Sequence, residues 1–198
     1  MVTKASDRTV ADRCSARERL LAAADELFYA EGVHTVGIDR VIEHAGVAKA
    51  SLYNTFGSKD ELIRCYLTER HIRIKQRMTR QLARYDAPRE RLLGVFDLIG
   101  EQSADPEFRG CAFVNASAES RPGDVVQQAA DEYRTWVLTL FTDLAHAAGA
   151  LDPDGLARQL VLLRDGAAVA VRMDRDPAAA AAAARTAAAA LLDAATPH

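Results

Sequence analysis

The segment from Thr35 to Leu62 constrains the fold more than any other part of the chain, because it holds two short helical patterns separated by a glycine. The first pattern has apolar residues at i, i+3, i+4 and i+7, which predicts one buried helix face. Those residues are Ile38, Val41, Ile42 and Ala45. Gly46 follows, and glycine can end a helix in the left-handed conformation without steric cost. The pattern therefore predicts a short helix that stops at a tight turn.

A second short helix is predicted directly after this turn, over residues 49–56. Leu52 and Phe56 face inward, four positions apart, and most of the other side chains are polar. A glycine ends this helix, and Ser58 with Glu61 forms a capping box for a third. Two short helices joined by a glycine-containing turn predict a helix-turn-helix, whose second helix can enter the DNA major groove.

The whole chain is expected to be all-α, with about nine helices and no period-2 strand pattern. We expect a disordered arm over 1–14, a helix-turn-helix domain over 15–62 and a helical domain over 63–198. A helix over about 59–85 should connect the two domains. Proline and glycine breaks separate the later helices, which we place at 88–103, 105–119, 125–148, 154–172 and 177–195.

The overall charge of the chain does not indicate DNA binding. The formal net charge is −3, and residues 1–66 hold nine Lys or Arg against ten Asp or Glu. Binding to a phosphate backbone must therefore depend on locally placed cations. Residues 70–91 are rich in arginine, and we interpret them as a solvated helix face, with contact to DNA as the alternative.

Cysteine and histidine placement argues against a metal site and against an enzyme. Cys14, Cys65 and Cys111 are far apart without metal-ligand spacing, which fits a reduced cytoplasm. We see no membrane-length apolar run and no signal-peptide core, and so expect a cytoplasmic protein. The chain has no zinc-protease histidine pair, P-loop, dinucleotide-binding turn or nucleophile elbow. We therefore expect no cofactor, no metal and no catalytic activity.

The segment from about Ala16 to Arg64 resembles the DNA-binding domain of the TetR family of bacterial transcriptional regulators. The residues that carry the resemblance include Gly46, Val47, Leu52, Tyr53, Phe56 and Lys59, at the spacing typical of that family. One departure is Ala48, where many relatives cap the second helix with Ser or Thr. Loss of such a cap costs ~1 kcal/mol.

The resemblance implies which side chains approach DNA. Lys49 and Asn54 can pair with bases or with phosphates, whereas Ala50 can offer only a methyl contact to thymine. The Tyr53 hydroxyl is expected to donate to a phosphate. The alternative for each is a solvated surface side chain. The expected DNA-binding residues are Thr35, Arg40, Lys49, Ala50, Ser51, Tyr53, Asn54 and Lys59.

The second half of the chain looks like a ligand sensor. It combines large apolar residues with a few polar groups, the composition of a small-molecule site, although a plain core is the alternative. The ligand would be a small apolar or amphipathic inducer of unknown identity. The candidate ligand-binding residues are Phe96, Ile99, Phe113, Asn115, Tyr133, Trp136, Leu140 and Arg172.

The last two predicted helices carry small residues that would let helices approach closely. In the TetR family the last two long helices form a four-helix homodimer interface, and the alternative is packing within one chain. A dimer also suits the mechanism, because paired recognition helices read two half-sites of a near-palindrome. The candidate interface residues are Leu163, Gly166, Ala167, Ala170, Ala184, Ala188 and Leu191.

These observations together predict a ligand-responsive transcriptional regulator. The expected mode is a dimeric repressor that binds a near-palindromic operator and is released by a small-molecule inducer. The alternative is a helical small-molecule-binding or adaptor protein without sequence-specific DNA binding.

Overall fold

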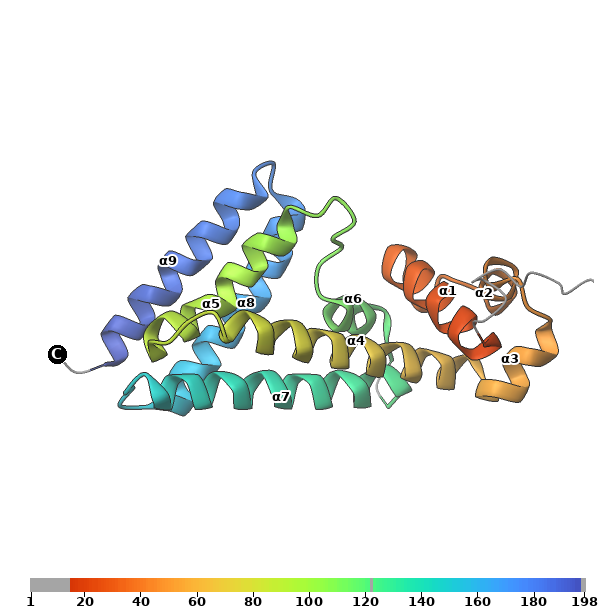
Figure 1. Ribbon diagram of the computed structural model, residues 1–198, viewed down its shortest axis with the longest axis horizontal. Helices are drawn as coiled ribbons and strands as arrows, with labels where there is room; N and C mark the ends of the chain where they lie inside the picture. The colour runs from red at the N-terminus through yellow and green to blue at the C-terminus, as the bar shows by residue number, and fades with distance from the viewer. Residues whose placement is uncertain (1–14, 122, 197–198) are drawn as a thin grey trace, which may run out of the picture. The chain divides into compact units, whose positions relative to one another are not determined.

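The computed structural model describes residues 15–121 and 123–196, and over these residues the fold is all-α, as predicted (Figure 1). The expected arm over 1–14 lies outside the described residues. Contacts within the chain divide it into two compact units, Met1–Tyr66 and Leu67–His198. The helices of the described residues are α1 (Ala16–Glu31), α2 (Ile38–Ala45), α3 (Lys49–Phe56), α4 (Lys59–Leu82), α5 (Pro88–Ser103), α6 (Ala112–Glu119), α7 (Val125–Ala147), α8 (Pro153–Met173) and α9 (Pro177–Ala195).

The first unit is built on α1, which packs against α2 and α3. The capping box at the start of α1 is present. Ser15 Oγ accepts from the Glu18 amide at 3.2 Å, and the Glu18 carboxylate accepts from the Ser15 amide at 2.7 Å. Leu20 and Phe28 are buried on the inner face of α1, and the Phe28 ring contacts Tyr66 of α4 edge-on at 5.6 Å. These contacts give the helix-turn-helix a rigid support.

The second unit is a bundle in which α8 packs on α7 and α9, and α5 packs on α9 and α7 (Figure 1). Its core holds large apolar side chains that are almost fully buried: Leu93, Phe96, Phe141, Leu160 and Leu192. Arg185 of α9 donates to Asp97 at 2.7 Å and to Glu90 at 3.1 Å on α5. These ion pairs fix the register between the two helices.

Two of the predicted helix boundaries differ from the structure. The sixth helix begins at Ala112 rather than at Asp105, because Asp105 forms a local turn instead of a helix cap. Its carboxylate accepts from the Glu107 amide at 2.9 Å, and its carbonyl accepts from the Phe108 amide at 2.9 Å. Aspartate side chains often compete with helix formation in this way. The fourth helix ends at Leu82 rather than near residue 85.

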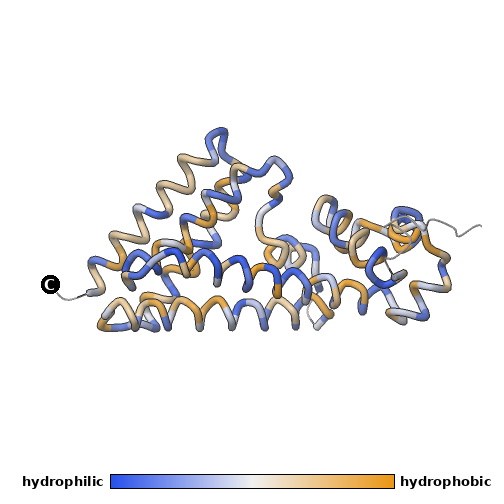
Figure 2. The backbone as a smooth tube through the Cα atoms, in the orientation of Figure 1, coloured by the Kyte–Doolittle hydropathy of each residue, from blue (hydrophilic) through white to orange (hydrophobic). Residues whose placement is uncertain are grey.

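The part of α4 in the second unit is mostly hydrophilic (Figure 2). Most of its basic side chains are exposed, which agrees with a solvated helix face: Arg73, Lys75, Arg77 and Arg80. Arg70 is half-buried.

The alanine-rich helix α9 corrects one expectation. By length and composition alone it could cross a membrane, with a mean hydropathy of 1.2, whereas we expected no such run. Ala181, Ala184, Ala188 and Leu192 form its buried face, which lies in the helix bundle with α5 and α8. Alanine accounts for the difference, because a run of small apolar residues reaches the hydropathy of a membrane span while serving close packing within the bundle.

Candidate nucleic-acid interface and internal cavity

The helix-turn-helix is formed by α2, a tight turn and α3. Gly46 ends α2 in the left-handed conformation, with φ 60° and ψ 42°, and the Val47 amide donates back to the Ile42 carbonyl at 3.3 Å. Only glycine adopts this conformation without strain. Leu52 and Phe56 are buried on the inner side of α3, as the four-residue spacing predicted.

The outer face of α3 is available to a partner. Lys49, Ala50 and Asn54 are exposed, Ser51 is half-buried, and the Tyr53 side chain is 46% exposed although it is a large aromatic. A half-exposed tyrosine presents a ring and a hydroxyl that can donate to a phosphate. The face combines one cation with polar and small side chains, which suits contact with a DNA groove.

The other three expected DNA-binding residues lie in the same unit. Thr35 and Arg40 are exposed, and Lys59 is half-buried at the start of α4 with its ammonium 6.0 Å from the centre of the Phe28 ring. All eight expected residues therefore belong to the first unit, but their contact with DNA stays a prediction.

Two of the expected DNA-binding cations are paired with carboxylates. Lys49 Nζ donates to Asp39 Oδ1 at 2.7 Å, and Arg40 Nη2 donates to Glu31 Oε1 at 2.7 Å. The hydrogen bond to Asp39 raises the pKa of Lys49 above its ordinary value, so the ammonium stays charged. The near-balanced charge of the first unit thus has a structural basis. Acidic side chains pair with these two cations at its surface.

The recognition helix α3 begins without a side-chain cap. Ala48 occupies the N-cap with an extended backbone, φ −71° and ψ 146°, and provides no side-chain hydrogen bond. The absence follows directly from the alanine, which has no acceptor atom. Burial of Leu52 and the Lys49–Asp39 ion pair hold the start of α3 in place instead.

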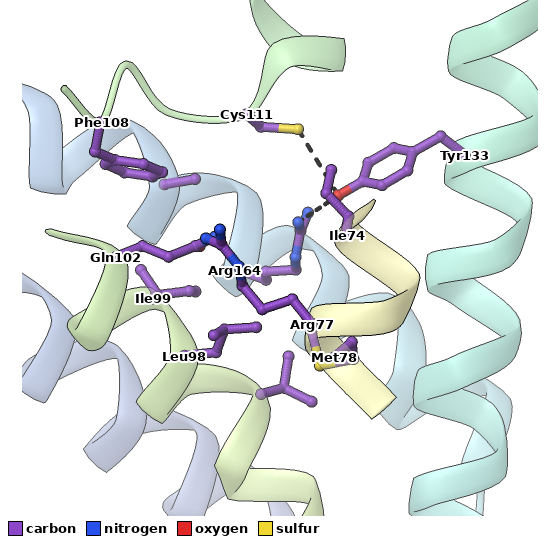
Figure 3. A pocket seen from close by; sticks show the side chains of 12 residues that line it. Ile74, Arg77, Met78, Leu98, Ile99, Gln102, Phe108, Cys111, Tyr133 and Arg164 are labelled. Atoms are coloured by element: carbon purple, nitrogen blue, oxygen red, sulfur yellow. Dashed lines mark hydrogen bonds between the residues drawn. The ribbon is translucent and has the colours of Figure 1, made fainter. Parts of the chain in front are cut away.

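The second unit contains a small internal cavity between α4, α5, α7 and α8 (Figure 3). Its volume is about 60 Å³. Seven lining side chains are apolar and five carry polar atoms or a thiol: Ile74, Met78, Val95, Leu98, Ile99, Phe108 and Ala168, with Arg77, Gln102, Cys111, Tyr133 and Arg164. This mixture of an apolar wall and a few polar groups is that of a small-molecule site.

An aromatic cluster adjoins this cavity through Tyr133. The Phe113 and Tyr133 rings are stacked, with centroids 4.0 Å apart and planes within 5°. The Trp136 ring lies 5.8 Å from Tyr133, and the His71 ring of α4 lies 5.3 Å from Trp136. Burial lowers the pKa of His71, and the Lys75 charge lowers it further, so the imidazole favours its neutral form.

The structure separates the candidate ligand-binding residues. Ile99 and Tyr133 line the cavity, and Phe113 lines an adjacent open groove on α6, α7 and α8. Phe96 is core, with its ring 6.0 Å from that of Phe141. The remaining candidates lie elsewhere: Trp136 and Leu140 are half-buried on α7, and Asn115 accepts from Arg172 at 2.8 Å.

Sequence reasoning missed Arg77, Gln102 and Arg164 as cavity residues. A signal for Arg164 was present, since it directly follows the apolar run Leu160–Leu163. An arginine at the end of such a run on a predicted core helix points to a buried charge with a purpose.

The candidate dimer residues also fall into two groups. Ala167, Ala184 and Ala188 are buried within the single chain, so their side chains already serve the internal packing of the bundle. Gly166 is exposed, with open space where a Cβ would lie. The other three, Leu163, Ala170 and Leu191, are half-buried. The large apolar side chains that α8 does expose are Leu162, Val169 and Met173.

Known proteins share both units of this chain. Residues 20–64 match the family described as bacterial regulatory proteins, tetR family, and residues 88–187 match the tetracyclin repressor-like C-terminal domain. The chain is similar to the crystal structure of a TetR-family transcriptional regulator from Streptomyces coelicolor, at 37% identity and a TM-score of 0.87. That similarity covers 92% of this chain and 96% of the other.

Two further relatives agree with this relationship. A putative tetR transcriptional regulator from Streptomyces avermitilis is 35% identical with a TM-score of 0.84, covering 93% of this chain and 100% of that one. The transcriptional activator FasR of Mycolicibacterium smegmatis is 45% identical over 56 residues, 28% of this chain and 25% of FasR. The chain spans between a quarter and about half of the length of the curated relatives that it matches.

A helix-turn-helix with an exposed polar recognition helix, followed by a separate helical unit, defines a DNA-binding transcriptional regulator. The class is one of regulators and not of enzymes. The matches across both units place the chain more narrowly: it belongs to the TetR family of bacterial transcriptional regulators.

Proposed function

We propose that this regulator is a cytoplasmic repressor that binds a near-palindromic operator as a homodimer and is released by a small-molecule inducer. The observation that carries the proposal is the exposed outer face of α3, where Tyr53 and Asn54 stand on a helix anchored by buried Leu52. The family relationship supplies DNA as the partner.

In this proposal the eight expected residues divide into two roles. Ala50, Ser51 and Asn54 face the bases, where their small or polar side chains can enter the groove. Tyr53 and Lys59 hold the phosphate backbone on either side. Thr35 and Arg40 extend the same surface along the groove, and Lys49 can donate to a base or to a phosphate.

The dimer is supported by the exposed apolar face of α8. Leu162, Gly166, Val169 and Met173 follow each other at i, i+4, i+7 and i+11, which places them on one face of the helix. Gly166 lets another helix approach closely, since no atom occupies the space where a Cβ would lie. A second copy of the chain is the occupant we propose, with the exposed side of α9 beside it.

Release by an inducer would act through α4, whose residues belong to both units. Two arrangements of α4 would set the separation of the two recognition helices in the dimer, and the inducer would stabilise the arrangement that misfits the operator. Such coupling is worth ~1–3 kcal/mol, or a loss of affinity of about 5–150-fold. A ligand that binds both arrangements equally would change nothing.

The test is fluorescence anisotropy with DNA from around the protein's own gene, compared with scrambled DNA across a salt series. We expect selective binding with dimer stoichiometry, a steep fall in affinity as salt rises, and loss of binding in Tyr53→Ala. Tyr53→Phe is the matched variant, because it keeps the ring and removes only the hydroxyl. A chain that binds no genomic fragment selectively would be a small-molecule binder or adaptor instead.

A further inference from the structure

The charged side chains that line the internal cavity are all positive. Its lining includes the guanidinium groups of Arg77 and Arg164 and no carboxylate. Figure 3 shows the two arginines reaching into the space from different helices, Arg77 from α4 and Arg164 from α8. In a largely apolar space, two cations without an anion favour an anionic ligand over a neutral or cationic one of similar shape.

Arg164 is the more buried of the two, with 12% of its side chain exposed. It donates to Asp165 Oδ1 at 3.0 Å and to the hydroxyl of Tyr133. Asp165 also pairs with Arg134, so one carboxylate serves two guanidinium groups. The Arg134 side chain is 55% exposed, so water also solvates its charge, and the cluster carries a net positive charge at the edge of the cavity.

The second arginine, Arg77, is partly exposed to solvent while it lines the cavity. Within residues 15–121 and 123–196, Arg77 forms no ion pair, although its neighbour Arg84 on the same segment pairs with Glu101. Arg77 also lines a wider outer pocket of about 390 Å³, which shares Leu98 and Gln102 with the cavity. The outer pocket therefore adjoins the cavity, and it is the side from which we expect a ligand to enter.

Neutral hydrogen-bonding groups complete the lining. Burial raises the pKa of Tyr133 far above its ordinary value, so its hydroxyl stays protonated. The Cys111 thiol lies 3.8 Å from that hydroxyl, and the Gln102 amide stands at the boundary with the outer pocket. These groups can donate to a bound oxygen without adding a negative charge that would repel it.

We infer that the effector of this regulator is a small organic carboxylate with a compact apolar body, its carboxylate held by Arg164 and Arg77. The inference rests on the proposed inducer function and adds the chemical class of the ligand. The planar guanidinium fork matches a carboxylate with two parallel hydrogen bonds. The seven apolar lining residues would enclose the rest of the molecule.

The size of the cavity limits this ligand. Its volume of about 60 Å³ is well below the ~300–1,000 Å³ of pockets that hold drug-sized molecules. Short aliphatic or single-ring acids therefore fit better than long-chain or multi-ring compounds. A longer acid would have to extend past Arg77 into the outer pocket.

The experiment compares carboxylates with uncharged analogues of the same shape on the full-length protein. The probes are benzoate and the straight-chain acids from acetate to octanoate, each against its primary amide. Trp136, the single tryptophan, lies 5.8 Å from Tyr133, so its fluorescence reports binding without DNA. A thermal-unfolding shift gives an independent readout, because a ligand that binds only the folded state stabilises it.

We expect one or more acids to bind about tenfold or more tightly than their amides, since hydrogen bonds to charged groups add that much. Arg77→Met should shrink this preference and Arg164→Met should abolish it. Arg77→Met leaves the buried Arg164 pairs intact, so it remains informative if Arg164→Met does not fold. Arg158→Met is the matched control, because Arg158 is exposed on α8 and lies outside the cavity lining.

Equal binding of acids and amides, no binding of any acid in the series, or an acid preference that survives both variants would overturn the inference. The ligand-binding and DNA-binding measurements distinguish failure of this inference from failure of the proposed function. Acid binding by a chain that never binds DNA selectively would contradict only the regulator proposal. Selective DNA binding that no acid affects, with no fluorescence change, would contradict only the carboxylate assignment.

Discussion

Lys49 Nζ and Asp39 Oδ1 lie 2.7 Å apart, which ties the first residue of the recognition helix α3 to the first turn of α2. Both side chains are exposed, so the pair is weak in stability terms. The ion pair matters for DNA binding rather than for stability. If Lys49 contacts DNA as proposed, a phosphate or a guanine has to compete with Asp39 for its ammonium, and we expect this carboxylate to lower affinity for every DNA sequence.

We therefore predict that Asp39→Asn raises DNA affinity. An exposed ion pair is worth ~0–1 kcal/mol, so the gain should be up to about fivefold at low salt. The dependence of affinity on salt should also steepen, because one more cation becomes available to phosphates. Anisotropy across a salt series measures both quantities.

The control for this prediction is Glu43→Gln, which removes another exposed carboxylate from α2 without touching Lys49. If both variants gain equally, the effect is general charge repulsion and Asp39 does not specifically restrain Lys49.

The missing cap of α3 gives a second prediction. Ala48→Ser supplies an acceptor for the orphan amides at the start of the helix, and should raise the free energy of unfolding by ~1 kcal/mol. The backbone at Ala48 is already extended, as an N-cap requires. Urea denaturation followed by circular dichroism measures the change. Ala50→Ser, the same substitution inside the helix, should be neutral or slightly destabilising, and an equal gain there would refute the capping explanation.

The elements that sequence could predict are those specified locally. The helix-turn-helix follows from Gly46 and from the spacing of Leu52 and Phe56, and the caps of α1 and α7 follow from Ser15 and Asp124. Each of these signals lies within a few residues along the chain. The predicted start of α6 was wrong because an aspartate before a proline has two possible structures. Asp176 caps α9, whereas Asp105 forms a turn.

The cavity could not be predicted because its lining comes from distant parts of the chain. Arg77, Gln102 and Arg164 lie on three helices that meet only in the folded bundle. The alanines of α9 show the same limit. The run of small residues and the family resemblance made Ala184 and Ala188 candidates for the dimer interface, but the fold buries both side chains within the single chain.

A third prediction concerns the exposed face of α8. If a second copy covers it, Leu162→Glu combined with Val169→Glu should convert the dimer to a monomer, because two charges would be buried in an apolar interface. Light scattering after size-exclusion chromatography measures the mass. Leu151→Glu is the matched control, since Leu151 is 77% exposed in the turn after α7 and lies outside this face. A double variant that stays dimeric would place the interface elsewhere.

The last prediction follows from His71, whose Nε2 atom is buried without a hydrogen-bond partner in the described part of the chain. Burial lowers its pKa below the ordinary 6.5, as does the Lys75 charge on α4, while Glu132 on α7 raises it to a lesser degree. The unfolded chain therefore binds a proton more readily than the folded one. Stability is then fully present above about pH 6.5 and is lost as the pH falls through that value toward the folded pKa.

Thermal unfolding between pH 8 and pH 5 tests this sign. His71→Phe should keep the aromatic contacts to Tyr133 and Trp136 and flatten the acid side of the stability curve, because the titrating group is gone. His146→Phe on α7 is the control, since His146 is exposed and should leave the curve unchanged. If the acid side of the stability curve is unchanged in His71→Phe, protonation of another group causes the loss of stability. Protonation of the unpaired His71 nitrogen would then make no measurable contribution to that loss.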